Sequence, residues 1–525
     1  MPGYYVENFG CRATQADGAA LERQFEEHGL SRSATSAEAA VVVLNTCTVT
    51  SSADQDARAA IRRVQRQNPE AKIVVTGCYA QRVPEEVAAL PGVSVVIGNS
   101  HKHHLAEIAL RGIRTTEPAL AQPIVAEPSS SESAAASFFP LQSLIASQKP
   151  EAGSPIFVSD IFAHTELLAA PVFDASNERT RPNLKVQDGC DNRCSFCVIP
   201  YVRGQSRSLE MDRVIREVSG LVESGYREVV ISGINLGRWG RDLSASRLSA
   251  FGSRNAAVGI GLAENEISLE NESRKPNAGS RTPTFEDLIR AILAETSLEK
   301  LRISSVEPMD WSDELISLVA QSPRIAKHAH VPMQSGSDAV LRRMHRKYRP
   351  WHYREKIMKI RAGMPFAAIG ADVMVGFPGE TDGEFEATRR MIEDLPFTYL
   401  HVFTYSPRPG TPAASMMDRI PVHVARERNR VLRELAGEKK LAFMRGFVGK
   451  EVEAITLRAQ DSADKHVRAT QNAARPEHFT EALTDNYLKL RLAGYHEPNR
   501  WLRARVEDVA DGALMGRVWA NTASE

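Results

Sequence analysis

The sequence predicts an α/β protein with three folded parts: an N-terminal parallel-sheet domain, a central partial (β/α)6 barrel and a small C-terminal β-barrel. Short apolar runs alternate with amphipathic stretches up to about residue 98, and a second, longer series of the same kind follows. The final segment consists of short strand-like runs. At 525 residues the chain is also too long for one ordinary domain.

The N-terminal domain is assigned to residues 1–114. Its apolar runs YYV, VVVLN and KIVVTG predict parallel strands, with helices over 19–28 and 53–67. A cysteine follows each run, at Cys11, Cys47 and Cys78. Because the carboxyl ends of parallel strands meet at one edge, we expect the three thiols to converge there. The alternative is three unrelated buried thiols.

The barrel is assigned to residues 178–444, after a linker at 115–177 that is rich in Ala, Ser and Pro. A polar stretch at 244–281 interrupts the barrel pattern and is expected to be a surface insertion. Right-handed crossovers through helices would join six strands: NLKVQ, REVVISG, KLRISS, AKHAHVP, AAIGADVMVG and YLHVFTY.

The C-terminal module is assigned to residues 445–520, after a long helix over 422–444. Short strand patterns predict a small β-barrel: KEVEAITL, NYLKLRL, WLRARVEDV and LMGRV.

Charge and targeting signals restrict where the protein works. Lys plus Arg equals Asp plus Glu at 65 each, so an RNA partner would have to meet a local basic patch. The N-terminus has no signal-peptide pattern, and no apolar stretch is long enough to span a membrane. We therefore expect a cytoplasmic protein without a membrane segment. In that reducing compartment, clustered cysteines are ligands or catalysts more often than disulfides.

A loop directly after the first barrel strand carries three cysteines, Cys190, Cys194 and Cys197, in the spacing CxxxCxxC. A structural zinc site usually has four protein ligands, whereas three thiolates suit a 4Fe-4S cluster with one iron left free. That iron can chelate the amino and carboxylate groups of S-adenosylmethionine, so that an electron from the cluster breaks a carbon-sulfur bond. Barrel active sites lie at the carboxyl ends of the strands, where this loop is expected.

This loop, with Phe196 before the last cysteine, resembles the signature of the radical S-adenosylmethionine superfamily. The contexts NFGCRATQAD, VVVLNTCTVTSSADQDARAAIRR and IVVTGCYAQR resemble the amino-terminal domain of the methylthiotransferase family. The resemblance continues through most of the chain: KVQDGCDNRCSFCVIPYVRGQSRS, ISGINLGRWG, RISSVEP, HVPMQSGSDAVLRRMHRKY, DVMVGFPGET and YSPRPGTPA.

The resemblance implies a carbon-sulfur bond-forming enzyme with two 4Fe-4S clusters and S-adenosylmethionine. Cys190, Cys194 and Cys197 would hold the cluster that generates a 5'-deoxyadenosyl radical. Cys11, Cys47 and Cys78 would hold an auxiliary cluster that carries the sulfur. It also implies a tRNA partner, a TRAM-like RNA-binding module in the tail, and an electron donor such as flavodoxin or ferredoxin; we expect a monomer.

Further residues are candidates for cofactor binding because of their expected positions near the cysteine loop or at strand ends. In the superfamily the backbone around the aromatic position contacts adenine, so Phe196 inherits that role, although it could equally be a core aromatic. Gly233 would allow a close backbone approach to the cofactor, or is an ordinary turn glycine. Glu307, Gln334 and Asp372 are expected at or just after the carboxyl ends of strands, where they would bind cofactor or substrate or act as structural polar groups.

Candidate RNA contacts are arginines and aromatic residues. Arg203 and Arg207 would contact phosphate or the cofactor, or pair with an acidic neighbour. The densest basic run, LRRMHRKYR at 341–349, would bind the tRNA backbone or form a solvated helix face. Tyr487 and Trp501 would stack on bases or lie in the core.

Three branches of the family differ in substrate: isopentenyladenosine in tRNA, threonylcarbamoyladenosine in tRNA, and an aspartate of a ribosomal protein. GCRATQ differs from the GCQMN-like form of the first branch, while NTCTVT and SGINLGRWG look like the second. We therefore expect 2-methylthiolation of N6-threonylcarbamoyladenosine next to the anticodon. A non-enzymatic RNA-binding iron-sulfur protein is the alternative from another class, and it would not cleave S-adenosylmethionine.

Overall fold

A computed structural model describes residues 3–111, 154–164, 167, 180–243, 282–458 and 479–519. The whole insertion at 244–281 therefore lies outside the described residues. Of the linker at 115–177, only residues 154–164 and 167 are described.

The N-terminal domain contains a parallel sheet in the order β2-β1-β3-β4-β5-β6. The strands expected from the three apolar runs are confirmed. The short strand β6 comes from the linker region and extends the sheet beside β5. The strands are β1 (Gly3–Asn8), β2 (Ser31–Arg32), β3 (Val41–Thr46), β4 (Lys72–Gly77), β5 (Val93–Ile97) and β6 (Ile156–Phe157).

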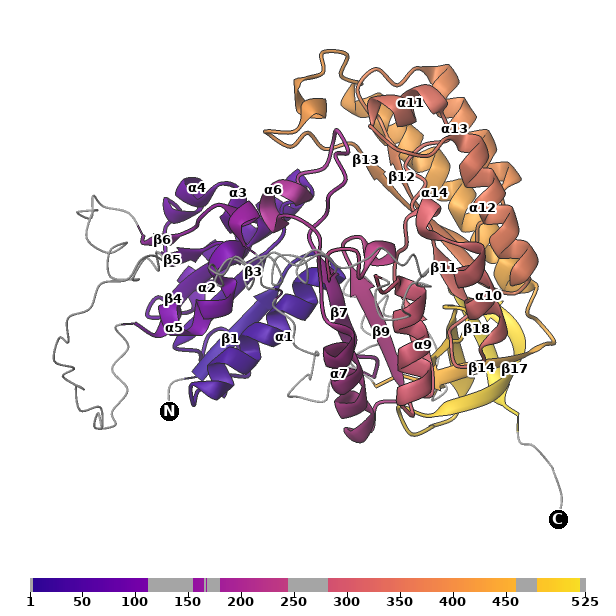
Figure 1. Ribbon diagram of the computed structural model, residues 1–525, viewed down its shortest axis with the longest axis horizontal. Coiled ribbons are helices and arrows are strands. Elements are labelled where there is room, and N and C mark those ends of the chain that lie inside the picture. Colours follow the sequence, from indigo (N-terminus) through magenta and orange to yellow (C-terminus); the bar gives the residue numbers. More distant parts are fainter. Residues whose placement is uncertain are drawn as a thin grey trace, which may run out of the picture.

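Helices cover both faces of this sheet (Figure 1). Helix α1 begins at residue 12, well before the predicted start at 19. The prediction missed its first turns because the side chains buried there include polar ones such as Thr14 and Asp17. Apolar periodicity cannot reveal a helix end of that kind. The helices are α1 (Arg12–Glu27), α2 (Ser51–Gln67), α3 (Cys78–Arg82), α4 (Pro84–Ala88), η1 (Asn99–His104) and α5 (Leu105–Leu110).

The central part holds all six predicted strands, in two sheets of order β10-β9-β7-β8 and β11-β12-β13. Isolated bridges from Leu301 to Ile325 and from Ser305 to His330 connect the two sheets, so the strands curve into an open barrel. The strands are β7 (Asn183–Asp188), β8 (Arg207–Ser208), β9 (Glu228–Gly233), β10 (Lys300–Ile303), β11 (His328–His330), β12 (Ala368–Val375) and β13 (Tyr399–Thr404).

Helices pack on the outer face of this open barrel and form one large apolar core with the strands (Figure 1). Thr284 and Thr381 form capping boxes that fix the starts of α9 and α13. In the described ranges, no helix is long and apolar enough to cross a membrane. The elements are α6 (Ile199–Arg203), α7 (Met211–Glu223), η3 (Leu236–Arg238), α9 (Phe285–Glu295), η4 (Pro308–Asp310), α10 (Asp313–Gln321), α11 (Asp338–Arg343), α12 (Pro350–Gly363), α13 (Asp382–Asp394), η5 (Pro412–Ser415) and α14 (Val422–Arg445).

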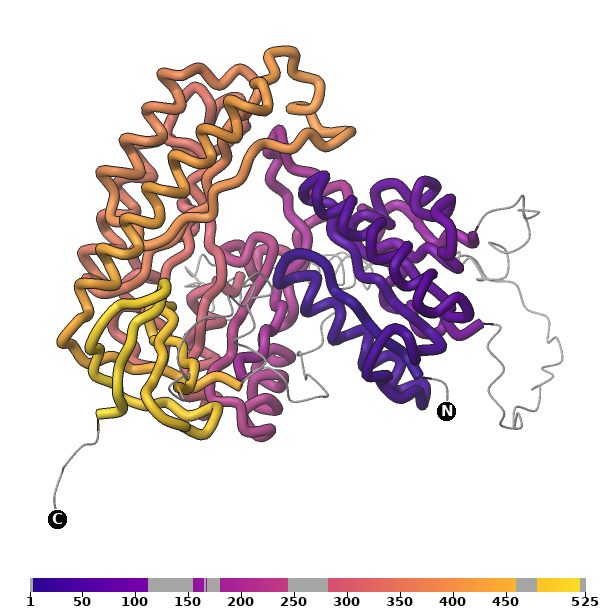
Figure 2. Tube along the Cα trace, turned by 180° about the vertical axis from the view of Figure 1, so that it is seen from behind, coloured from indigo at the N-terminus to yellow at the C-terminus, as the bar shows by residue number. Residues whose placement is uncertain are grey.

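The C-terminal module is a closed barrel in the order β14-β15-β16-β18-β17, as expected. Its strands are β14 (Glu451–Thr456), β15 (Phe479–Thr484), β16 (Lys489–Ala493), β17 (Trp501–Ala510) and β18 (Ala513–Val518); β15 was not predicted. The module lies beside the barrel (Figure 2), where Lys300 at the start of β10 pairs with Asp485 at 3.4 Å. Arg302 of β10 donates to the backbone carbonyl of Asp485 at 3.0 Å, so the module closes the floor of the open barrel.

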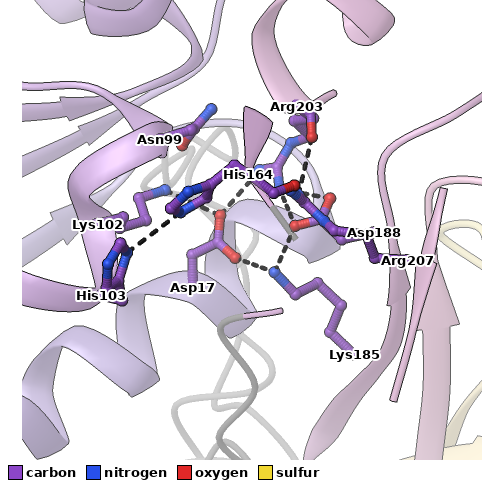
Figure 3. A pocket seen from close by; sticks show the side chains of 9 residues that line it. All are labelled: Asp17, Asn99, Lys102, His103, His164, Lys185, Asp188, Arg203 and Arg207. Carbon is purple, nitrogen blue, oxygen red and sulfur yellow. Dashed lines mark hydrogen bonds and ion pairs between the residues drawn. The ribbon is translucent and has the colours of Figure 1, made fainter. Parts of the chain in front are cut away.

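A buried ion network joins the N-terminal domain to the barrel (Figure 3). Asp17 of α1 pairs with Lys102 and Arg203, both at 2.9 Å, and also with Lys185 of β7. Asp188 pairs with the same Lys185 and Arg203. Burial alone would raise the pKa of both carboxyls, but the surrounding cations hold each pKa below its usual value. The network therefore fixes α1 along β7 with ionised carboxylates.

We predict that Asp17→Asn lowers the free energy of unfolding by about 3–5 kcal/mol, because it leaves buried cations without their carboxylate. Denaturant unfolding followed by circular dichroism measures the change. The matched control is Arg430→Gln, which breaks an exposed pair with Glu427 on α14 and should leave the unfolding midpoint unchanged. Equal effects of the two substitutions would contradict the structural role of the network.

Candidate functional site

The CxxxCxxC loop follows β7 and is anchored by the segments that surround it. The backbone N–H of Ser195 donates to the carbonyl of Met344 at 3.1 Å, and its hydroxyl donates to the carbonyl of Arg343 at 2.7 Å. The N–H of Ala413 donates to the carbonyl of Ser195 at 2.8 Å. These bonds hold the loop at the carboxyl end of the barrel strands, as the sequence predicted.

Nitrogen donors surround the sulfur atoms of this loop. Arg346 donates to Cys194 Sγ at 3.3 Å, and the backbone N–H of Asn192 donates to Cys190 Sγ at 3.4 Å. Asn235 lies on the other side, with its Nδ2 at 3.8 Å from Cys190 Sγ. Donors of this kind stabilise thiolate charge and tune an iron-sulfur cluster.

The three thiols of the loop lie close enough to oppose one another's ionisation. Burial raises the pKa of Cys197 to about 12, and the neighbouring Cys194 and Cys190 add to that shift. The pKa of Cys190 is also raised, first by burial. A cation placed among them would ionise all three, because metal binding stabilises the thiolate form. The donor set therefore fits the 4Fe-4S cluster that the spacing predicts.

The second set of thiols comes from three separate strand ends. Thr46 of β3 pairs in register with Gly77 of β4, so Cys47 and Cys78 are the next residues of two adjacent strands. Gly77 has a φ of +97°, and a Cβ there would lie 2.6 Å from the Thr46 backbone nitrogen. Only glycine allows the two strand ends to approach so closely.

Cys11 reaches the same edge through a second glycine. Gly10 has a φ of +98°, and a Cβ on it would lie 2.5 Å from Cys47 Cβ and 2.8 Å from its Sγ. Burial raises the pKa of Cys47 to about 12, with further contributions from Cys78 and Cys11. No disulfide forms among these cysteines. Their mutual proximity makes this group a second set of three thiols suited to a metal cluster.

The loops that carry the two sets of thiols pack on each other. Cys78 lies in a small apolar cluster with Val198, which directly follows Cys197, and with Val202 of α6. Asn99 donates to the carbonyl of Val202 at 2.7 Å and lies 3.6 Å from Cys78 Sγ. The chain therefore brings its six cysteines to one region between the N-terminal domain and the barrel.

Two predicted cofactor-binding residues lie beside the CxxxCxxC loop. Glu307 forms an ion pair with Arg346, the same arginine that donates to Cys194. Gly233 is the last residue of β9, where a Cβ would lie 2.9 Å from Gln187 Cβ, so the absence of a side chain is a packing requirement.

Gln334 has the geometry expected of a ligand-binding residue. It has a φ of 63°, which is strained for a residue with a side chain. Its side-chain oxygen is buried and has no hydrogen-bond partner among the described residues. A buried acceptor without a donor is costly unless a ligand supplies one.

The prediction that Asp372 lies at or just after the end of its strand is wrong. Asp372 lies in the middle of β12, inside the barrel. There it lies between two histidines that sequence reasoning missed: Oδ1 is 3.3 Å from His330 Nε2 and 3.6 Å from His401 Nδ1. The potential ligand atoms of the three residues lie within 4.8 Å of one another. The parallel pairing of β11, β12 and β13 creates this cluster, and no local sequence spacing signals it.

Phe196 is half-buried and packs against an apolar cluster that includes Met374 and Phe377. Its side chain therefore packs as a core aromatic would. Its adenine contact, which the superfamily assigns to the backbone, stays a prediction.

Several of the basic residues proposed as RNA contacts form ion pairs inside the protein, while Arg342, His345 and Lys347 are exposed. Arg203 pairs with Asp17 and Asp188, so its pairing with acidic neighbours is confirmed. In the basic run at 341–349, Arg346 is buried and Arg343 pairs with Glu384 at 2.8 Å. The run is therefore not simply a solvated helix face or a free phosphate-binding patch. The partners of Arg343 and Arg346 come from distant segments, which the local sequence does not show. Arg342 and Arg349 pair with the nearby Asp338.

Comparisons with known proteins agree with this architecture. Residues 3–98 match the model of the uncharacterized protein family UPF0004, and residues 184–392 match that of the radical SAM superfamily. A Bacillus subtilis protein named threonylcarbamoyladenosine tRNA methylthiotransferase MtaB is 32% identical over 92% of this chain and 89% of its own length. Its Aquifex aeolicus namesake is 30% identical over 95% of this chain and 99% of its own length.

A relative with a different name matches at a similar level. The tRNA-2-methylthio-N(6)-dimethylallyladenosine synthase of Endomicrobium trichonymphae is 28% identical over 86% of this chain and 88% of its own length.

The open barrel and its cysteine loop define a radical S-adenosylmethionine enzyme, which binds S-adenosylmethionine and a 4Fe-4S cluster. With an N-terminal domain of the matching kind and relatives aligned along nearly its whole length, the chain belongs to the radical S-adenosylmethionine methylthiotransferase family. The family expected from the cysteine motifs is confirmed.

We predict that Gly77→Ala lowers the free energy of unfolding by roughly 2–5 kcal/mol, from left-handed strain and the clash with Thr46. The control is Gly29→Ala, with a φ of +77° and no atom within 4 Å of the added Cβ, which should cost about 1–2 kcal/mol. Urea unfolding compares the two variants. Equal losses would mean that close approach of β3 and β4 is not required.

Proposed function

We propose that this chain is a tRNA methylthiotransferase that converts N6-threonylcarbamoyladenosine next to the anticodon to its 2-methylthio derivative. The observation that carries the proposal is the packing of two cysteine-bearing loops against each other at the barrel opening, with Cys78 against Val198 and Val202. Insertion of sulfur at an unactivated carbon requires a radical source and a sulfur source near the same substrate atom.

In this proposal Cys190, Cys194 and Cys197 hold the cluster that binds S-adenosylmethionine. When bound, that cluster supplies the electron that cleaves the sulfonium carbon-sulfur bond. Arg346 holds Glu307 in place and donates to Cys194 Sγ. Gln334 offers a buried carbonyl oxygen to a donor group of the cofactor. Phe196, Gly233 and Asp372 are proposed as further cofactor contacts.

Cys11, Cys47 and Cys78 are proposed to hold a second 4Fe-4S cluster. Asp17 and Asp188 raise the pKa of Arg203 against the opposing effect of burial, and Cys78 and Cys11 lie close enough to add to that shift. A cation in this position stabilises the negative charge of a thiolate-bound cluster. We further propose that the enzyme acts as a cytoplasmic monomer and receives electrons from a flavodoxin or ferredoxin.

The substrate assignment follows the relatives. Relatives named for threonylcarbamoyladenosine reach 30–32% identity over 85–95% of this chain, and those named for dimethylallyladenosine reach 28–31% over 85–87%. Three of the former align over more than 90% of this chain, which favours threonylcarbamoyladenosine. Isopentenyladenosine in tRNA and an aspartate of a ribosomal protein are the alternative substrates. An RNA-binding iron-sulfur protein without activity is the alternative outside enzymes.

The two sets of cysteines should have separable functions. Replacing Cys190, Cys194 and Cys197 by alanine should remove about half of the roughly eight iron atoms and abolish formation of 5'-deoxyadenosine. Replacing Cys11, Cys47 and Cys78 should also remove about half of the iron. That variant should still form 5'-deoxyadenosine but make no methylthio product. Iron assays and chromatography of 5'-deoxyadenosine give the comparison.

Methylthio product from the second variant would refute the role of the auxiliary cluster. Production of 5'-deoxyadenosine by the first variant would refute the assignment of the CxxxCxxC loop.

Deletion of the gene tests the substrate. We expect the methylthio form of threonylcarbamoyladenosine to disappear from total tRNA while methylthio-isopentenyladenosine persists, as measured by nucleoside mass spectrometry. Loss of the isopentenyl product instead would move the enzyme to the other tRNA branch. No change in either nucleoside would point to the ribosomal-protein substrate.

A further inference from the structure

Arg12 lies where the three folded parts of the protein meet. It is the first residue of α1 and directly follows Cys11. Its backbone carbonyl accepts a hydrogen bond from Asn183 of β7 at 2.9 Å. Its guanidinium donates to the hydroxyl of Tyr487, in the turn between β15 and β16, at 3.2 Å. The side chain therefore extends from the proposed auxiliary-cluster edge to the floor of the barrel.

Tyr487 is itself held in an unusual conformation. It has a φ of 68°, which is strained for a tyrosine. Its ring lies 4.8 Å from that of His328 and 6.1 Å from that of Tyr399, measured between centroids. The module thus directs this side chain into the polar interior of the barrel, where it meets Arg12.

A cavity of about 490 Å3 opens beside this contact. Its lining includes Tyr487, Tyr399, His401, Arg181 and Arg433. This volume falls within the range of sites that hold a small ligand or a nucleoside. The cavity extends from His401, the neighbour of Asp372, outward along the exposed helix α14.

The charge around Tyr487 favours an anion. Burial acts to raise the pKa of Tyr487, yet the pKa is lowered because Arg12, Arg181 and Arg302 together outweigh burial. Arg302 pairs with the buried Glu228, which also lies 3.7 Å from Arg181. In the described part of the chain, no carboxylate lies within ion-pair distance of Arg12.

The two candidate nucleosides differ in the group that would meet this site. A threonylcarbamoyl group ends in a carboxylate, which is ionised near neutral pH. An isopentenyl group is a neutral hydrocarbon. Placed against an unpaired cation, it would form no ion pair and would leave the cation without a counter-charge. A guanidinium binds a carboxylate through parallel hydrogen bonds, and a tyrosine hydroxyl can hold it in position.

Position supports the same assignment. The carbon that receives the sulfur belongs to the same six-membered ring as the carbon bearing N6, so the N6 substituent must lie close to the sulfur donor. Arg12 is the direct neighbour of Cys11, and its guanidinium donates to Tyr487, which lines the cavity.

We propose that Arg12, held by Tyr487, binds the carboxylate of the threonylcarbamoyl group and so selects the anionic nucleoside over the isopentenyl one. This inference rests on the proposed function. It makes Arg12 a specificity-determining residue of the substrate site and Tyr487 a positioning residue.

The test measures binding of the full-length enzyme, with its clusters reconstituted, to anticodon stem-loop RNAs by fluorescence anisotropy. One RNA carries threonylcarbamoyladenosine and a second carries its neutral methyl ester. A third carries unmodified adenosine. We expect Arg12→Gln to weaken binding of the first RNA about 10- to 100-fold and to leave the other two unchanged.

Three further variants make the outcome specific. Arg12→Lys should recover part of the affinity, and Tyr487→Phe should lose part of it, each only with the anionic RNA. Arg433→Gln removes a cation from the same cavity and should affect the acid and ester RNAs equally. Iron content and the visible spectrum check that the variants next to Cys11 retain their clusters.

If Arg12→Gln weakened binding of all three RNAs equally, Arg12 would contact phosphate and the inference would be wrong. If it weakened none of them, the inference would also be wrong. Failure of the proposed function gives a different pattern. In that case the unaltered enzyme itself would neither prefer the threonylcarbamoyl RNA nor convert it.

Discussion

Asp17 and Asp188 share Lys185 and Arg203 in a buried network that attaches the N-terminal domain to the barrel. Asp17 belongs to the helix that starts after Cys11, and Arg203 belongs to the helix that follows the CxxxCxxC loop. The same ion pairs therefore fix the relative position of the two sets of thiols. Buried charges are costly unless each finds a partner, so this geometry tolerates little displacement.

The barrel interior differs from an ordinary packed core. Its inner surface carries His330, Asp372 and His401 at mid-height, with Tyr399 and His328 nearer the floor. The apolar side chains of the same strands point outward and pack beneath the helices. Such an arrangement leaves polar groups to be satisfied by a ligand, as the unpartnered oxygen of Gln334 illustrates. The interior is therefore built as a binding site and not only as a support for the fold.

The C-terminal barrel contributes to this interior as well as closing it. Its β15–β16 turn places Asp485 near Lys300, at 3.4 Å, and Tyr487 beside Arg302 and Arg12. A module expected only to bind RNA thus also shapes the floor of the barrel. Attachment of the module and the shape of the barrel floor depend on the same few side chains.

The sequence by itself determined the parts of this protein that depend on local order. Strand and helix patterns predicted the parallel sheet, the six barrel strands and most of the closed C-terminal barrel, because periodic burial leaves a direct trace in the residue types. The spacing of Cys190, Cys194 and Cys197 identified the superfamily, because these three cysteines lie on one short loop and their spacing can be read directly from the sequence. The start of α1 escaped prediction because buried polar residues replace the apolar pattern there.

Only the tertiary structure decided which distant residues meet. It brought Asp372 between His330 and His401, paired Arg343 and Arg346 of the basic run with Glu384 and Glu307, and placed Arg12 against Tyr487. These contacts join segments separated by long stretches of chain, and strand pairing and domain docking create them. A single sequence carries no local signal for such pairs, because their energies arise only when burial removes water and forces each charge to find a partner.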